Sequence, residues 1–325
     1  MKMQEKSPSL SICIPTYNQP IAVRRLLEGL VSQYSSKIEI IIRDDSSNDE
    51  TRNVVQEFQN VMPVCYFHGE REGLDLAIIF LTEQAHGDFV WWMGDDILLP
   101  GGINEVLSII GKYPELSFLW VNSTNIFNAS QFAVQDLHSR FYRDKNDVLN
   151  IDIGLLGFIT ATIFKRDAAI PSLTAARLHV GSAFVCMYIV LYVISQGGRC
   201  YFLGKPCFAS YPKLPGEVRW YDQVQVFGIN LFKIVNKFAG DFNKRVIRQA
   251  IAKNLRMVLK AMVVERAMGF KTGFAATNSK LLPLARIYWN YPEFYIFLPL
   301  ILMPTPVLRI LHQGFKLFRG LSRRE

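Results

Sequence analysis

The sequence predicts an α/β fold, with a Rossmann-like, mostly parallel sheet that carries helices on both faces. From Leu10 to about Asn125, short β-branched or aromatic runs alternate with segments of helical period, and this alternation is typical of a doubly wound sheet. The strand runs, such as SICIP, EIIIRD and FVWWM, are apolar throughout, as expected for strands that helices cover on both faces. Half of the 325 residues are hydrophobic, which is enough for a sizeable core.

Nine elements are expected in this part of the chain. Runs of strand length bounded by turn residues predict strands at Leu10–Pro15, Glu39–Asp44, Val64–His68, Phe89–Met93 and Ser117–Asn122. Apolar residues at helical spacing predict helices at Ile21–Gln33, Asp49–Gln59, Leu74–Ala85 and Ile103–Lys112.

Longer apolar segments follow. Ile153–Phe164 is predicted to be a strand, or a strand-like pair, that ends in charged residues, and Ala183–Ser195 a helix buried on nearly all sides. Val224–Phe238 and Asp241–Met268 read as two further helices, the second with basic residues beside an apolar stripe.

Each of the first four predicted strands ends in polar or charged residues. The four strand ends read PTYN, DDSSNDET, HGEREG and GDD. The carboxyl ends of parallel strands meet at one edge of a sheet, where the loops splay apart and ligands bind. We therefore expect acidic groups, an aromatic ring, hydroxyls and Arg71 to lie together at this edge, a set that suits a base, a ribose and a diphosphate.

The fourth strand end carries two adjacent carboxylates, Asp95 and Asp96. Like charges this close repel each other, so they are tolerated best around a cation. Oxygen ligands suit Mg²⁺ or Mn²⁺, and those ions suit a diphosphate. The alternative is a solvated turn in which an aspartate caps the following helix.

The order PTYN, DDSSNDET, a glycine-containing turn with Arg71, and GDDILLPGG resembles the N-terminal half of the family 2 glycosyltransferases of the GT-A fold. The resemblance is greatest to the branch that acts in bacterial O-antigen and polysaccharide assembly, including abequosyltransferase-like enzymes. It implies a GT-A catalytic domain over residues 1–215, with nucleotide-sugar binding in 9–125 and an acceptor part in 126–215. The implied reaction is metal-assisted transfer of a sugar from a nucleotide-sugar donor to a lipid-linked oligosaccharide.

The resemblance also implies roles for the donor-binding residues. Pro15, Thr16 and Tyr17 would form a wall of the nucleotide pocket. Asp44 would contact the base and Asp45 would support that loop. Arg71 would lie near the base or the phosphates.

At the reacting end, the resemblance implies that Asp95, with Asp96 beside it, holds Mg²⁺ or Mn²⁺ on the sugar diphosphate. The family pattern has another acidic residue two places earlier, where this chain has Met93. The family's acidic base is also missing from the segment that begins at His179, so His179 itself is the first candidate base. Asp167 and Asp152 follow. The alternative function is a non-catalytic sugar-nucleotide-binding or scaffold protein of the same fold.

Residues 216–325 are predicted to form a helical region that lies on a membrane. The chain carries a net charge of +8, which indicates an anionic partner. The apolar stretch 294–308 is shorter than the roughly 20 residues of a spanning helix and contains three prolines. Aromatic residues precede it, and Arg309, Lys316, Arg319, Arg323 and Arg324 follow it.

This pattern predicts a peripheral, interfacial anchor on the cytoplasmic face of the inner membrane. The alternative is a buried pair of helices. No basic-aromatic nucleic-acid motif is visible, so we expect no nucleic-acid partner. The five scattered cysteines lack metal-ligand spacing, which indicates a reducing compartment.

Overall fold

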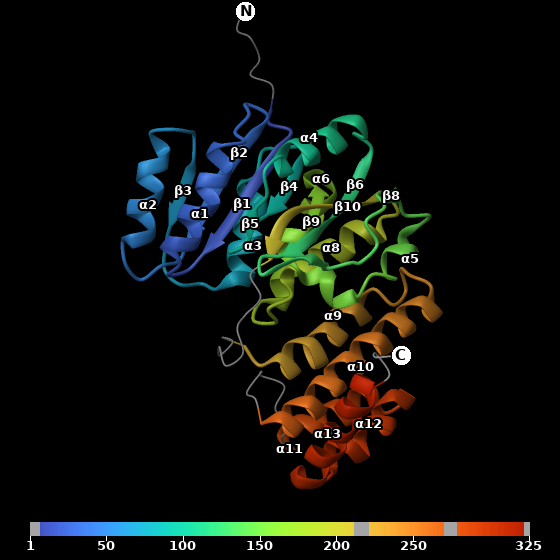
Figure 1. Cartoon of the computed structure of the whole chain (residues 1–325). Coiled ribbons are helices and arrows are strands. Elements are labelled where there is room, and N and C mark those ends of the chain that lie inside the picture. Colours follow the sequence, from blue (N-terminus) through green and yellow to red (C-terminus); the bar gives the residue numbers. More distant parts are fainter. Residues whose placement is uncertain (1–6, 211–220, 270–277, 322–325) are drawn as a thin grey trace, which may run out of the picture.

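The computed structural model describes residues 7–210, 221–269 and 278–321, and it confirms the α/β class (Figure 1). All nine elements predicted up to Asn125 are present, with ends shifted by at most three residues, and one short strand, β5, is added. Their bounds are β1 (Leu10–Thr16), α1 (Pro20–Val31), β2 (Ile38–Asp44), α2 (Glu50–Gln59), β3 (Cys65–His68), α3 (Leu74–Gln84), β4 (Phe89–Trp92), β5 (Ile97–Leu98), α4 (Gly102–Lys112) and β6 (Leu116–Asn125).

The following segment is made of short elements around one long strand and one buried helix. They are β7 (Asn128–Phe132), β8 (Arg140–Phe141), α5 (Lys145–Val148), the 3₁₀ helices η1 (Ile153–Gly157) and η2 (Ile159–Ala161), β9 (Thr162–Lys165), α6 (Arg166–Ala169), η3 (Ile170–Ser172), α7 (Leu173–Ala176), η4 (Arg177–His179), α8 (Val185–Ser195) and β10 (Arg199–Ser210).

The sheet is mixed rather than mostly parallel. Its strand order is β3-β2-β1-β4-β9-β6-β10-β5, with β7 on β6 and β8 on β10. The first four strands are parallel, but β9 runs antiparallel between β4 and β6. The right-handed crossover rule places α1 and α2 on one face and α3 on the other, because the chain reverses its direction across the sheet after β3. The packing agrees, since α1 contacts α2, and α3 contacts α8.

The segment 153–164 differs from its prediction. Only its end is a strand, and the preceding residues form η1 and η2. A continuous apolar run is compatible with any buried conformation, so periodicity could not distinguish them. Two local features mark the 3₁₀ segment. The Asp152 side chain accepts a hydrogen bond from the Gly154 N–H. At Gly157, a Cβ would overlap the ring of Phe184.

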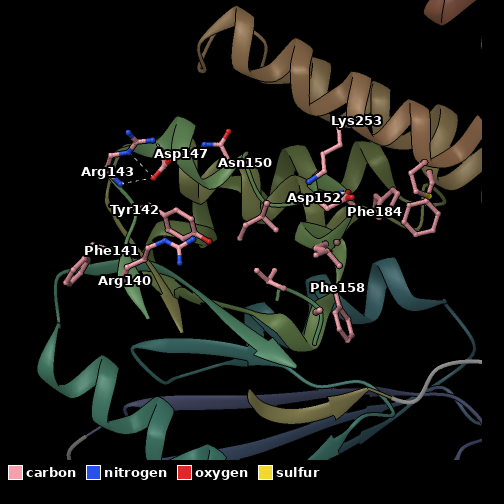
Figure 2. Close-up of a pocket in the computed structure, with 18 of the residues that line it drawn as sticks. Arg140, Phe141, Tyr142, Arg143, Asp147, Asn150, Asp152, Phe158, Phe184 and Lys253 are labelled. Atoms are coloured by element: carbon pink, nitrogen blue, oxygen red, sulfur yellow. Dashed lines mark hydrogen bonds and ion pairs between the residues drawn. The ribbon is translucent and has the colours of Figure 1, made fainter. Parts of the chain in front are cut away.

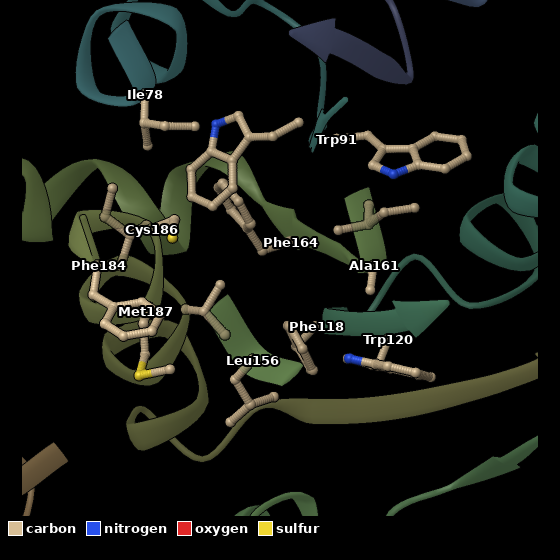
Figure 3. Close-up of a cluster of buried hydrophobic side chains, with 14 of the residues drawn as sticks. Ile78, Trp91, Phe118, Trp120, Leu156, Ala161, Phe164, Phe184, Cys186 and Met187 are labelled. Carbon is tan, nitrogen blue, oxygen red and sulfur yellow. The ribbon is translucent and has the colours of Figure 1, made fainter. Parts of the chain in front are cut away.

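A buried aromatic cluster fixes the strand that leads to Asp95 (Figure 3). Trp91 and Trp92 of β4 are fully buried, and Trp92 meets Phe164 of β9 edge-on at 4.6 Å between ring centroids. The Trp91 Nε1–H donates to the Thr160 carbonyl oxygen at 2.8 Å. Helix α8 packs on β6 and β9 and, as predicted, is buried on nearly all sides. The end of β4 is therefore held rigidly.

The C-terminal region is helical, as predicted. Its elements are the π-helix η5 (Val224–Asn230), α9 (Leu231–Lys237), α10 (Lys244–Met268), α11 (Asn278–Tyr288), α12 (Pro292–Leu302) and α13 (Thr305–Leu321). Helix α10 begins at its cap Asn243 and packs on η1, α12 and α13, while α9 contacts α8 (Figure 1). The predicted domain boundary at residues 215/216 lies outside the described residues.

Within the described residues, each helix taken singly is too short or too polar to cross a membrane. The pair Pro292–Leu302 and Thr305–Gln313 meets the requirements of length and composition together, with a bend of 107° at the break between them.

Candidate active site

Three of the four strand ends meet at one cavity of about 560 Å³. It lies beyond the carboxyl ends of β1, β2 and β3, which are adjacent in the sheet. The lining residues are Tyr17, Asp45, Ser46, Ser47, His68, Gly69, Glu70 and Arg71. The topology rule that predicted a shared edge thus brings together residues that lie more than 50 positions apart.

Tyr17 and Arg71 form one wall of this cavity. The Arg71 guanidinium lies 4.2 Å from the centroid of the Tyr17 ring, and Tyr17 is 38% exposed. Pro15 and Thr16 stand just before it at the end of β1, and the buried Thr16 Oγ1 has no hydrogen-bond partner among the described residues. A flat aromatic face beside a cation suits a nucleotide, and a buried, unpaired hydroxyl is a group that a ligand can satisfy.

Asp45 lines the cavity as well as supporting its loop, whereas Asp44, the residue expected to contact the base, is enclosed by the protein. Asp44 is fully buried, and its carboxylate accepts hydrogen bonds from the Tyr66 hydroxyl at 2.6 Å and the Ser46 N–H at 2.9 Å. Asp45, not Asp44, lines the cavity. The physical reason is the period of two in extended chain, which points successive side chains to opposite sides. In this structure Asp44 shapes the loop from within.

Asp45 also holds the turn that carries Arg71. Its Oδ2 accepts the N–H groups of Glu72 and Gly73 at 3.0 and 3.1 Å, and its Oδ1 pairs with Arg43 Nε at 2.8 Å. Arg43 reaches Glu72 as well and lies over the ring of Phe80. This network fixes the third strand-end loop against the second.

Some residues around the cavity received no role from the sequence. Asn18, at a φ of 50°, donates its N–H to Ser46 Oγ at 2.8 Å and accepts the Ser47 N–H at 3.0 Å. A His68 ring nitrogen, Nε2, lies 3.1 Å from the Ser46 carbonyl oxygen. Their position at strand ends was the feature of the sequence that could have indicated a role. Residue type could not, because serine and histidine occur in many settings.

Asp95 follows the end of β4, the strand beside β1. Strand β4 pairs with β1 so that Cys13 stands opposite Trp92, and Asp95 comes three residues after Trp92. The Asp95 side chain is exposed, and its carbonyl oxygen accepts a hydrogen bond from Arg25 at 2.7 Å. Asp96 is buried and has contacts of its own within the protein. Asp95 is therefore the carboxylate that a ligand can reach.

The donor set fits a metal that is shared with a substrate. In the described part of the chain, no three Asp, Glu, His or Cys residues are grouped closely enough to hold an ion by themselves. Mg²⁺ is usually bound by one or two carboxylates together with substrate phosphates and waters, so Asp95 beside a diphosphate is sufficient.

The three candidate bases lie in different places. Asp167 is 84% exposed and follows β9, whose last residue pairs with the first residue of β4. It therefore lies at the edge of the sheet opposite Asp95. Asp152 lies at a second, larger cavity.

His179 lines neither of the two cavities. Its ring packs on Tyr188 at 4.7 Å between centroids. Burial and the nearby Lys237 lower its pKa, against a smaller opposing effect of Asp75. The ring is therefore neutral near pH 7, as a base requires, and its catalytic role stays a prediction.

The comparison with protein families identifies the family of the first half of the chain. Residues 11–168 match the model of "Glycosyl transferase family 2". The chain carries a glycosyl transferase family 2 domain at these residues. The matched range covers β1 to β9 and includes Tyr17, Asp45, Arg71 and Asp95.

Relatives of this family 2 chain include bacterial glycosyltransferases. It is 32% identical over 219 residues to abequosyltransferase RfbV of Salmonella typhimurium, covering 61% of this chain and 65% of that protein. It is 31% identical over 104 residues to GalNAc(5)-diNAcBac-PP-undecaprenol beta-1,3-glucosyltransferase of Campylobacter jejuni, covering 31% and 34%. An uncharacterized glycosyltransferase of Rickettsia typhi is 25% identical over 182 residues. The chain spans about half of that relative's length, 55%.

Solved structures share the GT-A fold of this family 2 chain. S. aureus TarS 1–349 in complex with UDP-GlcNAc superposes with a TM-score of 0.66 at 13% identity, covering 94% of this chain and 92% of TarS 1–349. The mannosyltransferase PcManGT from Pyrobaculum calidifontis, in complex with GDP-Man and Mn²⁺, gives a TM-score of 0.53 at 14% identity, covering 94% and 88%. At such identities the likeness establishes the fold.

Proposed function

We propose that this protein is a glycosyltransferase that moves a sugar from a nucleotide-sugar donor to a lipid-linked glycan. The observation that supports the proposal is the placement of Tyr17, Arg71 and Asp95 after the carboxyl ends of parallel strands of one sheet, with Tyr17 and Arg71 in contact. A base and its phosphates fit beside the Tyr17 ring and Arg71. The sugar diphosphate would then reach Asp95.

Asp95 would hold Mg²⁺ or Mn²⁺ on the diphosphate, and the bound ion would neutralise the charge that develops as the nucleoside diphosphate leaves. Arg71 would add positive charge from the protein side. The acceptor hydroxyl forms the new bond to the sugar's anomeric carbon while the bond to the diphosphate oxygen breaks. A base, for which His179 is our candidate, takes the hydroxyl proton.

The names of two relatives support the proposed acceptor class. RfbV is named an abequosyltransferase and the C. jejuni enzyme acts on an undecaprenol-diphosphate-linked glycan. Both names support a role for this chain in O-antigen-like, cell-surface polysaccharide biosynthesis, with a lipid-linked glycan as acceptor.

Calorimetric titration with UDP, GDP, CDP and dTDP, each with and without Mn²⁺, tests the donor site. We expect one nucleotide to bind, at least about tenfold more tightly with Mn²⁺, since Asp95 would hold the ion that neutralises the diphosphate charge. Binding of that nucleotide by an Asp95→Ala variant should be indifferent to the metal. Metal-independent binding by the unmodified protein would contradict the Asp95 site.

A non-catalytic sugar-nucleotide-binding protein of the same fold is the alternative function. It is favoured by Met93, where the family has an acidic residue, and by an α8 segment without carboxylates. Nucleotide binding without sugar transfer to any extracted glycolipid would support it.

We propose that the C-terminal helices lie on the inner-membrane surface, with the protein peripheral on the cytoplasmic face. Large apolar side chains are exposed on and beside α11, α12 and α13: Leu282, Trp289, Tyr295, Ile296, Leu302, Val307, Ile310 and Leu311. Arg309 is exposed among them. An apolar surface with adjacent cations is typical of interfacial binding to anionic lipid. Of the predicted basic tail, Arg323 and Arg324 lie outside the described residues.

Exchange of three of these side chains should release the protein from membranes. The variant Trp289→Ser/Ile296→Ser/Ile310→Ser is expected to bind vesicles containing phosphatidylglycerol at least about tenfold more weakly in co-sedimentation, because burying each large apolar side chain contributes about 1.5–3 kcal/mol. Thermal unfolding should be unchanged, since all three side chains are exposed.

The matched control replaces three equally exposed apolar residues of the α/β part, Ile21, Val61 and Leu178, by serine. This control should sediment like the unmodified protein. Equal loss of binding in both triple variants would show that the membrane contact is unspecific and would refute the assignment to α11–α13.

A further inference from the structure

The larger cavity lies between the segment 133–158 and helix α10 (Figure 2), and it shares no lining residue with the nucleotide-binding cavity. Its volume of about 1170 Å³ exceeds the roughly 300–1,000 Å³ of common small-molecule sites. Phe158 and Phe184 contribute aromatic faces to its walls. The cavity can therefore hold more than one sugar unit, and its apolar walls suit the C–H faces of sugar rings or a prenyl group.

Tyr142 presents an unsatisfied polar group to this cavity. The side chain is only 9% exposed, and its hydroxyl has no hydrogen-bond partner among the described residues. Burial raises its pKa, against the opposing charge of Arg140, so the hydroxyl keeps its proton and can donate. A buried hydroxyl without a partner is costly, by about 1–3 kcal/mol, and a ligand oxygen would remove that cost.

Three cations line the cavity, namely Arg143, Arg140 and Lys253. Arg140 of β8 lies beside Tyr142, and Lys253 points in from α10 (Figure 2). Arg140 forms an ion pair with Asp136, with 2.6 Å between Nη1 and Oδ2. Lys253 forms no ion pair with any described residue.

The two carboxylates on the cavity wall have partners of their own. Asp147 pairs with Arg143 at 2.9 Å, and Asp152 accepts the Gly154 N–H. Among the described residues the Tyr142 hydroxyl has no hydrogen-bond partner and Lys253 has no ion pair, so both can contact an anionic ligand.

The cavity leads toward the reacting end of the donor site. Gly157 and Phe158 line it, and two residues later Thr160 Oγ1 accepts the Gly94 N–H at 3.1 Å. Asp95 is the next residue after Gly94. On the other side, α10 packs on α12 and α13, which carry the exposed apolar side chains. A molecule in this cavity therefore lies between the proposed membrane-facing helices and the Asp95 loop.

We propose that this cavity binds the acceptor through a phosphate or diphosphate attached to its glycan, with the Tyr142 hydroxyl, Arg140 and Lys253 as the groups that hold the anion. The proposal rests on the proposed function, because it assigns the acceptor's place. Anchoring the phosphate end here leaves the sugar end to extend toward Asp95. The exposed apolar helices then receive the lipid.

Titration of the full-length protein with farnesyl diphosphate in EDTA tests this assignment, because chelation removes the metal on which diphosphate binding at Asp95 depends. We expect binding by the unmodified protein and about tenfold weaker binding by Tyr142→Phe and by Lys253→Gln, since each variant loses one contact to a charged group. Farnesol, which lacks the diphosphate, should bind at least about tenfold more weakly.

The control variant is Lys260→Gln, which removes the same charge from the same helix outside the cavity. It should bind like the unmodified protein. Tyr142→Phe should unfold at the same temperature or higher, because its hydroxyl has no partner to lose. Unchanged binding in both Tyr142→Phe and Lys253→Gln, or equal binding of farnesol, would overturn the proposal.

The nucleotide titration with Mn²⁺ separates this test from that of the proposed function. Nucleotide binding without farnesyl diphosphate binding would refute the acceptor cavity and leave the glycosyltransferase standing. Farnesyl diphosphate binding that depends on Tyr142, with no nucleotide bound, would support the anion site and refute the donor site.

Discussion

Asp95→Ala is expected to lower the rate of sugar transfer by at least about 10²–10³-fold, the usual loss when one group that stabilises transition-state charge is removed. The side chain is exposed at the end of a rigid, buried strand, so the fold should be unaffected. Single-turnover transfer of radiolabelled sugar to extracted glycolipid, together with the unfolding temperature, measures both effects.

The control for this prediction is Asp167→Ala, which removes an exposed carboxylate at the opposite edge of the sheet. It should transfer sugar at the normal rate. A normal rate of transfer by Asp95→Ala would contradict the metal-site assignment. A low rate by Asp167→Ala would make that residue a candidate base again.

Asp45→Ala is expected to weaken nucleotide binding by at least about tenfold and to destabilise the protein by about 3 kcal/mol, as found when one partner of a buried ion pair is removed. The carboxylate is 5% exposed and anchors Arg43 together with the N–H groups of Glu72 and Gly73. Without it, the turn that carries Arg71 loses its attachment to the second strand-end loop. Urea unfolding and nucleotide calorimetry measure the two effects.

Asp49→Ala is the matched control, because Asp49 belongs to the same acidic loop but is exposed and pairs with Arg52 across the surface. We expect nearly unchanged stability, since exposed ion pairs contribute about 0–1 kcal/mol, and unchanged nucleotide binding. Equal destabilisation by both variants would mean that the Asp45 network is not what holds the loop.

The sequence by itself determined the first half of the fold and the edge at which the site lies. Strands covered on both faces read as continuous apolar runs, and their spacing by helical segments leaves few topologies. Because parallel strands end at one edge, Tyr17, Arg71 and Asp95 could be assigned to a common rim before their positions were known. The order of the motifs predicted the family, and the match over residues 11–168 confirms that prediction.

Only the tertiary structure decided which side chains face the ligand. Asp44 and Asp45 are adjacent and chemically identical, yet one is enclosed by Tyr66 and the other lines the cavity, because burial depends on neighbours from other strands. The sequence likewise did not determine that β9 is antiparallel or that 3₁₀ helices precede it. An apolar run suits any buried conformation, so it cannot distinguish them. The cavity with Tyr142 and Lys253 joins residues more than 100 positions apart, so no local pattern could have shown it.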